Sequence, residues 1–444
     1  MRYTSSKSSS LTGTVDVPGD KSMSHRSIMF GLLAAGTTTV KGLLTGEDVM
    51  CTADAARALG ASVTEKEDGT WVIESKGLKH LTEPDRVLDM GNSGTSTRLL
   101  MGLVAGYDFT CTFTGDHSLI KRPMARISDP LTAMGAKFIT RTGGRLPLSV
   151  KGSAALNPIS YELPVASAQV KSAILLAGLN AEGNTSVIET KPTRDHTENM
   201  LRHFGAVVDV ETLDNNAQKI TVHGKPDLKG CDIVIPADPS SAAFPVVAAI
   251  LTEGSDIRIE NVGMNERRAG VFTTLIEMGA DITIENARDM AGEPVADLHV
   301  KYNGPLSGIN VPAERVPSMI DEFPILSVAA ACAKGTTTIT DLAELRVKES
   351  DRLLMVAEGL KKCGVELEMA EDSLTVHGTG NAPKGTNDAD EIETALDHRI
   401  AMSFLVLGLA TQNPVTIDDG SPIATSFPSF IPLMRALGAK IDTV

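Results

Sequence analysis

The sequence has none of the features that would place this protein in a membrane or outside the cell. No uninterrupted apolar stretch approaches the roughly 18 to 20 residues that a membrane-spanning helix needs. The longest apolar segments, such as Phe323–Ala333, are predicted to lie in a protein core. The N-terminal stretch Met1–Leu11 is polar and serine-rich and contains no apolar region typical of a secretory signal. We therefore expect a cytoplasmic protein that does not bind a membrane.

Cysteine and histidine are too dispersed to indicate a metal site. The five cysteines lie far apart, with no C-x-x-C pair and no histidine at ligand spacing: Cys51, Cys111, Cys231, Cys332 and Cys363. The nine histidines likewise form no pair at metal spacing. This usage is typical of a reducing compartment, and we expect neither a bound metal nor a disulfide framework.

An excess of positive charge and the best-known catalytic motifs are also missing. The formal net charge is −15 at pH 7, which argues against a general affinity for nucleic acid. There is no serine-hydrolase elbow and no dinucleotide-binding G-x-G-x-x-G after a strand. The stretch Gly91-Asn92-Ser93-Gly94 lacks the Lys-Ser/Thr ending of a phosphate-binding P-loop. An anionic ligand would therefore need a local cluster of cations.

What the sequence does contain is a repeated unit of roughly 70 to 80 residues, longer than the period of ordinary solenoid proteins. Each unit opens with a short polar signature and continues into an apolar helix. The openings are Gly19–Ser27, Gly91–Arg98, Ala166–Ser172, Asp238–Phe244, Asp321–Pro324 and Asp397–Arg399. Ser22 is expected to cap the first of these helices.

Glycine or asparagine is expected to end each of these first helices, because both residues tolerate a left-handed backbone. The six positions are Gly36, Gly106, Gly183, Gly254, Gly335 and Asn413. β-Favouring runs follow, as in Thr37–Val40, Thr185–Ile188 and Thr336–Ile339. A second helix is then predicted to end in a tag with a central glycine, followed by another strand. The tag glycines are Gly60, Gly135, Gly205, Gly279, Gly364 and Gly438.

Six such units in 444 residues are too many for one compact core. We therefore predict an α/β fold of two similar domains, each built from three repeated β/α units and hinged around a central cleft. The third unit passes into the fourth near Ile235–Asp238. No proline- or serine-rich linker marks this boundary, which favours a tight hinge.

Cations gather at the openings, where helix N-termini present unpaired N–H groups and the positive end of the helix dipole. In the first half of the chain they are Lys21, Arg26, Arg98 and Lys171, with Lys121, Arg122, Arg126 and Arg194 nearby. In the second half they are Arg346, Lys348, Arg352 and Arg399. If the openings converge, this set would bind two phosphorylated molecules through arginine forks and lysine point charges.

Two acidic residues lie among these bases. Asp321 begins the fifth opening, and Glu349 directly follows Lys348. A carboxylate beside lysine and arginine is held ionised, whereas a partly desolvated one retains a proton, so the pair suits general acid–base catalysis. The alternative is structural: Asp321 would only cap a helix, and Glu349 would only pair with Arg352 three residues later. The residues by themselves leave both interpretations open.

Taken together, these signatures resemble the 3-phosphoshikimate 1-carboxyvinyltransferase (EPSP synthase) family along essentially the whole chain. The motifs that carry the resemblance are Pro18–Ser22 with His25-Arg26, Gly91–Thr95, Lys121–Met124, Ser167–Gln169, Asp321-Glu322, Arg346–Arg352 and Asp397–Arg399. The variants Ser167–Lys171 (SAQVK) and Arg194–Glu198 (RDHTE) look like the bacterial branch of the family known for glyphosate tolerance.

The resemblance implies a transferase of the shikimate pathway, in chorismate and aromatic amino-acid biosynthesis. Its reaction transfers the enolpyruvyl group of phosphoenolpyruvate to the 5-hydroxyl of shikimate 3-phosphate and releases phosphate. It implies a monomer without a metal or organic cofactor. It also implies an N-terminal strand that crosses into the other domain, so the expected domains are 1–19 with 237–444, and 20–236.

The resemblance also implies roles for individual residues. Asp321, Glu349 and Lys21 would be catalytic, with Asp321 taking the hydroxyl proton and Glu349 supplying a proton to the methylene carbon. Shikimate 3-phosphate would be bound by Lys21, Ser22, Arg26, Ser167, Ala168, Gln169, Arg194, Asp321 and Lys348. Phosphoenolpyruvate would be bound by Lys21, Gly94, Arg122, Gln169, Arg352 and Arg399. One departure is Thr425, which stands where many relatives carry a further phosphate-binding lysine.

Two alternative functions remain open. One is the related enolpyruvyl transferase that acts on UDP-N-acetylglucosamine, which uses a cysteine in a mobile loop. His117 lies at that position here, and the nearest cysteine, Cys111, lies in a strand-like run. The other is a non-catalytic repeat scaffold that binds anions. The pair Asp321 and Glu349 among the cations favours an enzyme.

Overall fold

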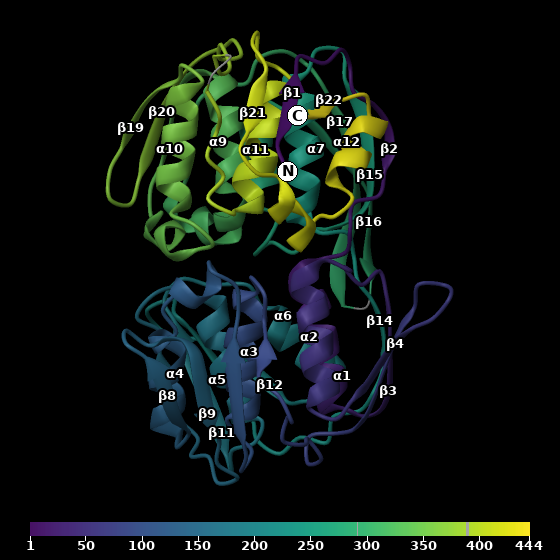
Figure 1. Cartoon of the computed structure of the whole chain (residues 1–444), viewed down its shortest axis with the longest axis vertical. Coiled ribbons are helices and arrows are strands. Elements are labelled where there is room, and N and C mark those ends of the chain that lie inside the picture. The colour runs from purple at the N-terminus through teal and green to yellow at the C-terminus, as the bar shows by residue number, and fades with distance from the viewer. Residues whose placement is uncertain (291, 388–389) are drawn as a thin grey trace. The chain divides into compact units, whose positions relative to one another are not determined.

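The chain forms two compact units in the computed structural model shown in Figure 1. Unit 1 consists of Met1–Asp20 and Pro236–Val444, and unit 2 consists of Lys21–Ile235. The structure describes residues 1–290, 292–387 and 390–444. The chain passes between the units after Asp20 and after Ile235, each time one residue from the domain boundary expected from the sequence.

Each polar opening leads into a helix that is almost entirely buried. In unit 2 these are α1 (Lys21–Leu33), α3 (Gly94–Val104) and α5 (Ala168–Gly178). In unit 1 they are α7 (Pro239–Leu251), α9 (Phe323–Cys332) and α11 (His398–Gly408). Every residue of α9 is buried, as predicted for that segment. Helices α3 and α5 pack so closely that a Cβ on Gly102 would lie 2.2 Å from the carbonyl oxygen of Ala173, so only glycine fits there.

A strand, a second helix and further strands follow each buried helix. The strands directly after the buried helices are β3 (Ala35–Lys41), β7 (Thr110–Thr114), β11 (Asn184–Glu189), β15 (Asp256–Gly263), β18 (Lys334–Ile339) and β21 (Val415–Ile417). The second helices are α2 (Glu47–Ala58), α4 (Ala125–Met134), α6 (His196–His203), α8 (Gly270–Glu277), α10 (Arg352–Lys362) and α12 (Phe430–Ala436). Both sets agree with the predicted order of elements.

After each second helix the sequence predicts one strand, and the structure has a hairpin in five of the six described units. The hairpins are β4 (Ser62–Glu65) with β5 (Trp71–Lys76), β8 (Lys137–Arg141) with β9 (Arg145–Lys151), β12 (Val208–Thr212) with β13 (Gln218–His223), β16 (Asp281–Met290) with β17 (Glu293–Lys301), and β19 (Glu366–Met369) with β20 (Leu374–Thr379). The sixth unit has β22 (Lys440–Thr443) alone. The remaining strands are β1 (Tyr3–Ser6), β2 (Thr12–Val15), β6 (Leu88–Asp89), β10 (Ser160–Glu162) and β14 (Asp232–Val234).

Strands from the N-terminus complete two sheets of unit 1. In unit 2 the sheet orders are β14-β3-β5-β4, β6-β7-β9-β8 and β10-β11-β13-β12. In unit 1 they are β16-β17-β15-β2, β18-β20-β19 and β21-β1-β22. Strand β1 lies between β21 and β22, which is the place that β20 has between β18 and β19. It pairs antiparallel with both neighbours, from Tyr3↔Ile417 and from Tyr3↔Thr443. The N-terminal strand therefore replaces the missing strand of the sixth hairpin.

Glycine ends the second helices as predicted but not the first helices. All six tag glycines are left-handed, with φ between 84° and 117°. Gly36, Gly183, Gly254 and Gly335 also have positive φ, but each lies three to five residues beyond the last residue of its helix, so these glycines follow the helix ends and do not terminate the helices directly. Gly106 and Asn413 do not have positive φ, so the predicted left-handed backbone was wrong at these two positions. Gly106 is required for space, because a Cβ there would lie 2.3 Å from the Cβ of Asn180.

The predicted cap of the first helix was also wrong. Helix α1 begins at Lys21, so Ser22 lies inside its first turn and cannot be the N-cap residue. In four other buried helices the expected type of cap is present: Ser93, Ser167, Asp238 and Asp397 each accept a hydrogen bond from a backbone N–H of the helix that they precede. No helix of the described residues is long and apolar enough to cross a membrane.

Candidate active site

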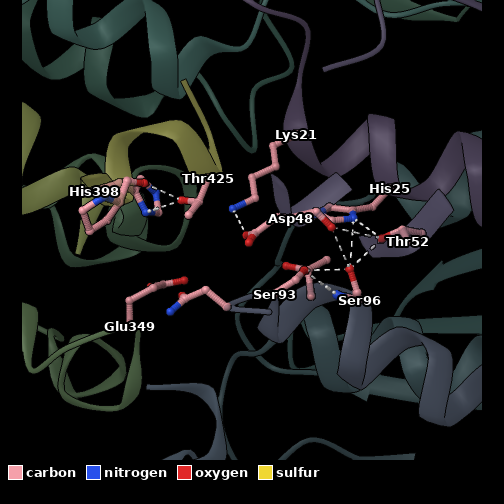
Figure 2. A network of polar contacts seen from close by, with 12 residues as sticks. Lys21, His25, Asp48, Thr52, Ser93, Ser96, Glu349, His398 and Thr425 are labelled. Atoms are coloured by element: carbon pink, nitrogen blue, oxygen red, sulfur yellow. Dashed lines mark hydrogen bonds and ion pairs between the residues drawn. The ribbon is translucent and has the colours of Figure 1, made fainter. Parts of the chain in front are cut away.

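In unit 2 the first predicted ligand-binding lysine is held by an acidic residue. Lys21, the first residue of α1, forms an ion pair with the buried carboxylate of Asp48 on α2 (Figure 2). Asp48 was not predicted, because nothing in its local sequence marks it as a partner of a residue 27 positions earlier. The pair fixes a cation at the N-terminal end of a helix, where the helix dipole already favours an anion.

A network of hydrogen bonds connects α1, the middle of α2 and the beginning of α3 (Figure 2). The Nδ1 atom of His25 lies 2.7 Å from the Thr52 hydroxyl, and this hydroxyl lies 2.6 Å from that of Ser96. Ser96 in turn contacts the hydroxyl of Ser93, the N-cap of α3, at 2.7 Å. The network thereby holds the first turn of α3, which begins at Gly94, against α1 and α2. His25 has a structural hydrogen-bonding role here.

Arg26 is buried and oriented by three hydrogen bonds from its guanidinium group. Its Nε donates to Thr197 Oγ1 (2.7 Å) and its Nη2 donates to Ser172 Oγ (2.8 Å). Its Nη1 donates to the carbonyl oxygen of Ser22 (3.0 Å). A guanidinium group that is fixed in this way presents a planar fork of defined direction to a ligand.

Arg98, Arg122 and Gln169 form a second cluster in the same unit. Arg98 Nη1 donates to Gln169 Oε1 (2.6 Å), and Gln169 Nε2 donates to Thr95 Oγ1 (3.1 Å). Arg122 Nη2 donates to Asn92 Oδ1 (2.7 Å). Both arginines lie beside Gly94, since a Cβ on that glycine would meet Arg98 Nη1 at 3.0 Å and Arg122 Nη1 at 3.2 Å. Gly94 therefore leaves space next to two cations.

The remaining predicted residues of unit 2 occupy the ends of elements. Ser167 is the N-cap of α5, and Ala168 is its first residue. Arg194 lies in the segment between β11 and α6. Lys171, which the sequence pattern groups with the anion-binding cations, is instead completely buried between two carboxylates, Glu189 at 3.0 Å and Glu198 at 2.7 Å. Its charge is already compensated within the protein, so that assignment was wrong.

In unit 1, Arg352 brings both predicted catalytic acids together. Its Nη1 donates to Asp321 Oδ1 (3.1 Å), and its Nη2 lies 2.5 Å from Glu349 Oε2. Its Nε donates to Asp397 Oδ2 (2.8 Å). The guanidinium group is 1% exposed. Burial lowers the pKa of Arg352, but the charges of Asp397, Glu349 and Asp321 outweigh burial and raise the pKa above its usual value, so Arg352 stays a cation.

Two further cations complete this group. Lys348 Nζ lies 3.4 Å from Asp321 Oδ1. Arg399, near the start of α11, donates from Nη1 to the carbonyl oxygen of Asp321 (3.0 Å) and lies 3.6 Å from Glu322 Oε1. Asp321 itself lies in a 3₁₀ turn, Ile320–Glu322, and the N-cap of α9 is Glu322. The interpretation of Asp321 as a helix cap was therefore wrong, whereas the predicted contact between Glu349 and Arg352 is present.

Thr425 contributes no charge to this group. It is buried at the end of the 3₁₀ turn Ser421–Thr425, where its hydroxyl donates to the carbonyl oxygen of Pro422 (2.7 Å) and lies 3.5 Å from Nδ1 of His398 (Figure 2). Among the described residues, no group of three or more His, Cys, Asp or Glu side chains could hold a metal ion.

Cys111 does not have the properties of a reactive cysteine in a mobile loop. It lies inside β7, is 1% exposed, and its pKa is raised to about 12 by burial and by Glu83. A thiol with such a pKa is almost fully protonated and unreactive at neutral pH. Cys111 therefore cannot take the place of the mobile-loop cysteine that the UDP-N-acetylglucosamine enzymes use.

The fold corresponds to one class of protein, the enolpyruvyl transferases. The fold matches that of the enolpyruvyl transferase NikO from Streptomyces tendae, with a TM-score of 0.77 over 99% of this chain and 98% of that one at 18% identity. It also matches EPSP synthase from Acinetobacter baumannii, with a TM-score of 0.86 at 48% identity over 99% of both chains.

The sequence comparisons define the family within this class. The family model for EPSP synthase (3-phosphoshikimate 1-carboxyvinyltransferase) matches residues 5–434. A 3-phosphoshikimate 1-carboxyvinyltransferase from Paramagnetospirillum magneticum is 60% identical over 438 residues, which are 99% of this chain and 97% of that protein. One from Jannaschia sp. is 55% identical over 439 residues, with coverage of 99% and 97%. The chain belongs to the EPSP synthase family.

These findings confirm the predicted α/β fold, the predicted class of enzyme and the predicted main function. Both of these sequence relatives are named as 3-phosphoshikimate 1-carboxyvinyltransferases and not as UDP-N-acetylglucosamine transferases or binding scaffolds. Sequence reasoning missed the residues that contact the predicted ligand-binding groups of Lys21 and Arg26, namely Asp48, Ser172 and Thr197. Ser172 belongs to the third polar opening and Thr197 to the RDHTE motif, so only their roles were missed; Asp48 has no signal in a single sequence.

Proposed function

We propose that this chain transfers the enolpyruvyl group of phosphoenolpyruvate to the 5-hydroxyl of shikimate 3-phosphate and releases inorganic phosphate. The observation that carries this proposal is the contact of one buried arginine, Arg352, with both Asp321 and Glu349. A guanidinium group that contacts both carboxylates holds the proposed base and the proposed acid close to each other, as an addition reaction with one proton acceptor and one proton donor requires. Lys348 and Arg399 add positive charge at the same place.

Shikimate 3-phosphate is bound, in this proposal, by cations and by donors at helix N-termini. The assigned residues are Lys21, Ser22, Arg26, Ser167, Ala168, Gln169, Arg194, Asp321 and Lys348. The support from geometry is strongest for Arg26, whose guanidinium group is fixed by three hydrogen bonds, and for Ser167 and Ala168, which begin α5. A helix N-terminus and a fixed guanidinium group are both favourable partners of a phosphate or carboxylate.

Phosphoenolpyruvate is assigned to Lys21, Gly94, Arg122, Gln169, Arg352 and Arg399. The space at Gly94 beside Arg98 and Arg122 supports the assignment in unit 2. Because Thr425 brings no charge, the set contains one cation fewer than the family pattern with lysine at that position. Lys21 is assigned to both substrates, and its ammonium group stabilises the negative charge that moves between them.

The acid–base steps balance with two carboxyl groups. Asp321 accepts the proton of the 5-hydroxyl while the oxygen of that hydroxyl forms a bond to C2 of phosphoenolpyruvate. The π electron pair of the C2–C3 double bond takes a proton from Glu349 at C3. In the second step the proton on C3 returns to Glu349 and the double bond forms again, while the C2–O bond to phosphate breaks and the leaving phosphate takes up the proton held by Asp321. Lys348 and Arg352 beside Asp321 favour the ionised form that can accept the first proton.

The test is phosphate release with phosphoenolpyruvate and each acceptor in turn. Shikimate 3-phosphate should support turnover and UDP-N-acetylglucosamine should not. Asp321→Asn and Glu349→Gln should each lower kcat by a factor on the order of 10² or more, with much smaller changes in substrate binding. Glu366→Gln, at an exposed carboxylate on β19, is the matched control. Near-native turnover of both catalytic-site variants would overturn the acid–base assignment.

Finer properties belong to the same proposal. We infer that the chain is a cytoplasmic monomer that binds neither nucleic acid nor a membrane, in agreement with its net charge of −15. We also infer that it belongs to the bacterial branch with glyphosate tolerance, from its SAQVK and RDHTE motifs. Relatives in that branch often carry alanine at the position of Gly94, so tolerance here should be partial and should depend on other residues.

A further inference from the structure

Lys171 lies in the interior of unit 2 at the centre of a completely buried ion cluster. Its side chain is 0% exposed, and its partners Glu189 and Glu198 are 1% and 2% exposed. Its Nζ lies 3.0 Å from Glu189 Oε1, 2.7 Å from Glu198 Oε1 and 3.5 Å from the carbonyl oxygen of Thr193. The cluster holds two carboxylates and one ammonium group, all removed from water.

The three acceptors belong to three different segments. Glu189 is the last residue of β11, Thr193 lies in the connection after it, and Glu198 is on α6. A lysine ammonium group has three donors, and here each is aimed at another segment from a position on α5. An apolar side chain of the same size would fill the space and would not fix the direction of any of the three.

One of these segments carries Arg194. Thr193, directly before it, is held twice: its carbonyl oxygen by Lys171, and its hydroxyl by a hydrogen bond to Glu189 Oε2 of 2.7 Å. The backbone before Arg194 is therefore attached to the buried cluster, and this attachment restricts the position of the Arg194 Cα atom.

The neighbouring residues on the same helices hold Arg26. Ser172 follows Lys171 on α5, and Thr197 precedes Glu198 on α6. Their hydroxyl groups lie 2.7 Å apart, and each accepts a hydrogen bond from Arg26. A shift of α6 relative to α5 would separate the two acceptors and release the guanidinium group.

A buried ion pair seldom stabilises a protein more than well-packed apolar residues of the same volume would, because both charges lose their hydration. Its specific contribution is geometric. We propose that Lys171 is a positioning residue that, through Glu189 and Glu198, holds Arg194 and the acceptors of Arg26 in place for shikimate 3-phosphate. This inference rests on the assignment of both arginines to that substrate in the proposed function.

The main test is the double variant Lys171→Met with Glu198→Gln. It leaves one excess negative charge in the cluster, as in the native protein, and it conserves the approximate volume of both side chains. We expect the KM and the Kd for shikimate 3-phosphate to rise about tenfold or more, the effect of losing one charge-assisted hydrogen bond. The KM for phosphoenolpyruvate should change less than threefold. Lys229→Met, at an exposed lysine of the same unit that pairs with Asp227, is the control and should behave as the native protein.

A second pair of variants changes no charge in the buried cluster. Thr193→Val removes the hydroxyl that donates to Glu189 and should raise the KM for shikimate 3-phosphate by about threefold or more. Thr193→Ser keeps the hydroxyl and should restore most of the native KM. Unfolding midpoints of all variants, measured in parallel, show whether the fraction of folded enzyme has changed.

The outcomes are separable. A native Kd for shikimate 3-phosphate in both Thr193→Val and the double variant would overturn the positioning role, as would an equal rise in KM for both substrates. A lower unfolding midpoint with unchanged KM values would show a purely structural role. Calorimetric titration of the native protein with shikimate 3-phosphate alone, followed by turnover, tests the proposed function independently of Lys171.

Discussion

Arg352 is an ionised side chain in a place that water hardly reaches, and its neighbours explain why. Asp397, Asp321 and Glu349 surround a guanidinium group that is 1% exposed. Two of these carboxylates are the proposed base and acid, so a single arginine determines the position of both. Arginine suits this place better than lysine, because its planar fork can bind several carboxylates in fixed directions and it does not lose its proton.

Gly94 is the residue at which the structure suggests a direct test of ligand size. Its φ is not in the left-handed region, so alanine would cause no backbone strain, and the new methyl would contact the ends of Arg98 and Arg122. Glyphosate is longer than phosphoenolpyruvate and should meet this methyl first. We expect Gly94→Ala to raise the inhibition constant for glyphosate more than the KM for phosphoenolpyruvate.

The measured quantity is the ratio of the two constants in the native protein and in the variant. An unchanged unfolding midpoint would show that the alanine affects only the site. A ratio that stays constant or decreases would contradict the proposed position of phosphoenolpyruvate beside Gly94.

At the scale of the secondary-structure elements, the six second helices all end at a glycine with the same type of backbone conformation. In all six, the tag glycine has a left-handed backbone, and this conformation turns the chain from the helix into the following strand. At Gly279 the effect of conformation can be isolated, because a Cβ there would meet nothing within 4 Å. Any cost of a side chain at this position arises from its φ of 99° and not from a clash.

We therefore expect Gly279→Ala to lower the free energy of unfolding by about 1–2 kcal/mol, the cost of a left-handed backbone for an ordinary residue. Gly279→Asn should cost less, because asparagine tolerates this region better. Denaturant titrations with equal m-values would measure both. Equal stability of the native protein and the alanine variant would contradict the role of the tag.

At the scale of the whole molecule, the N-terminal strands complete sheets whose other strands come from the second half of the chain. The sixth unit lacks its own third strand, and β1 supplies it between β21 and β22. Strand β2 pairs with β15 in the fourth unit. Unit 1 therefore needs the first twenty residues, although more than two hundred residues of unit 2 intervene.

Deletion of Met1–Ser6 should accordingly destabilise unit 1. It removes the backbone hydrogen bonds of β1 to both neighbours, and we expect a loss of roughly 3 kcal/mol or more in unfolding free energy. Deletion of Met1-Arg2 alone is the control, because these residues precede β1 and their ion pairs with Asp419 and Glu391 lie at the surface. Similar unfolding curves for the two truncations would show that β1 contributes little.

Much of this protein could be predicted from its sequence alone, because the signals are local and repeated. Helix openings, β-favouring runs and glycine tags recur in six registers, and each reports on the backbone within a few residues. The motifs around Lys21, Gly94 and Asp321 likewise indicate the family, because each is a run of neighbouring residues. The errors at Ser22, Gly106 and Asn413 concern single positions at the ends of helices, where the sequence pattern is least precise.

The tertiary structure decided which charges are paired and which strand completes which sheet. Lys171 looks like an anion-binding cation in the sequence, but Glu189 and Glu198 compensate it from 18 and 27 residues away. Asp48 holds Lys21, and β1 pairs with strands more than four hundred residues later, again without a local signal. Burial and pairing depend on where distant segments meet in space, whereas periodicity and turn chemistry depend only on neighbours along the chain.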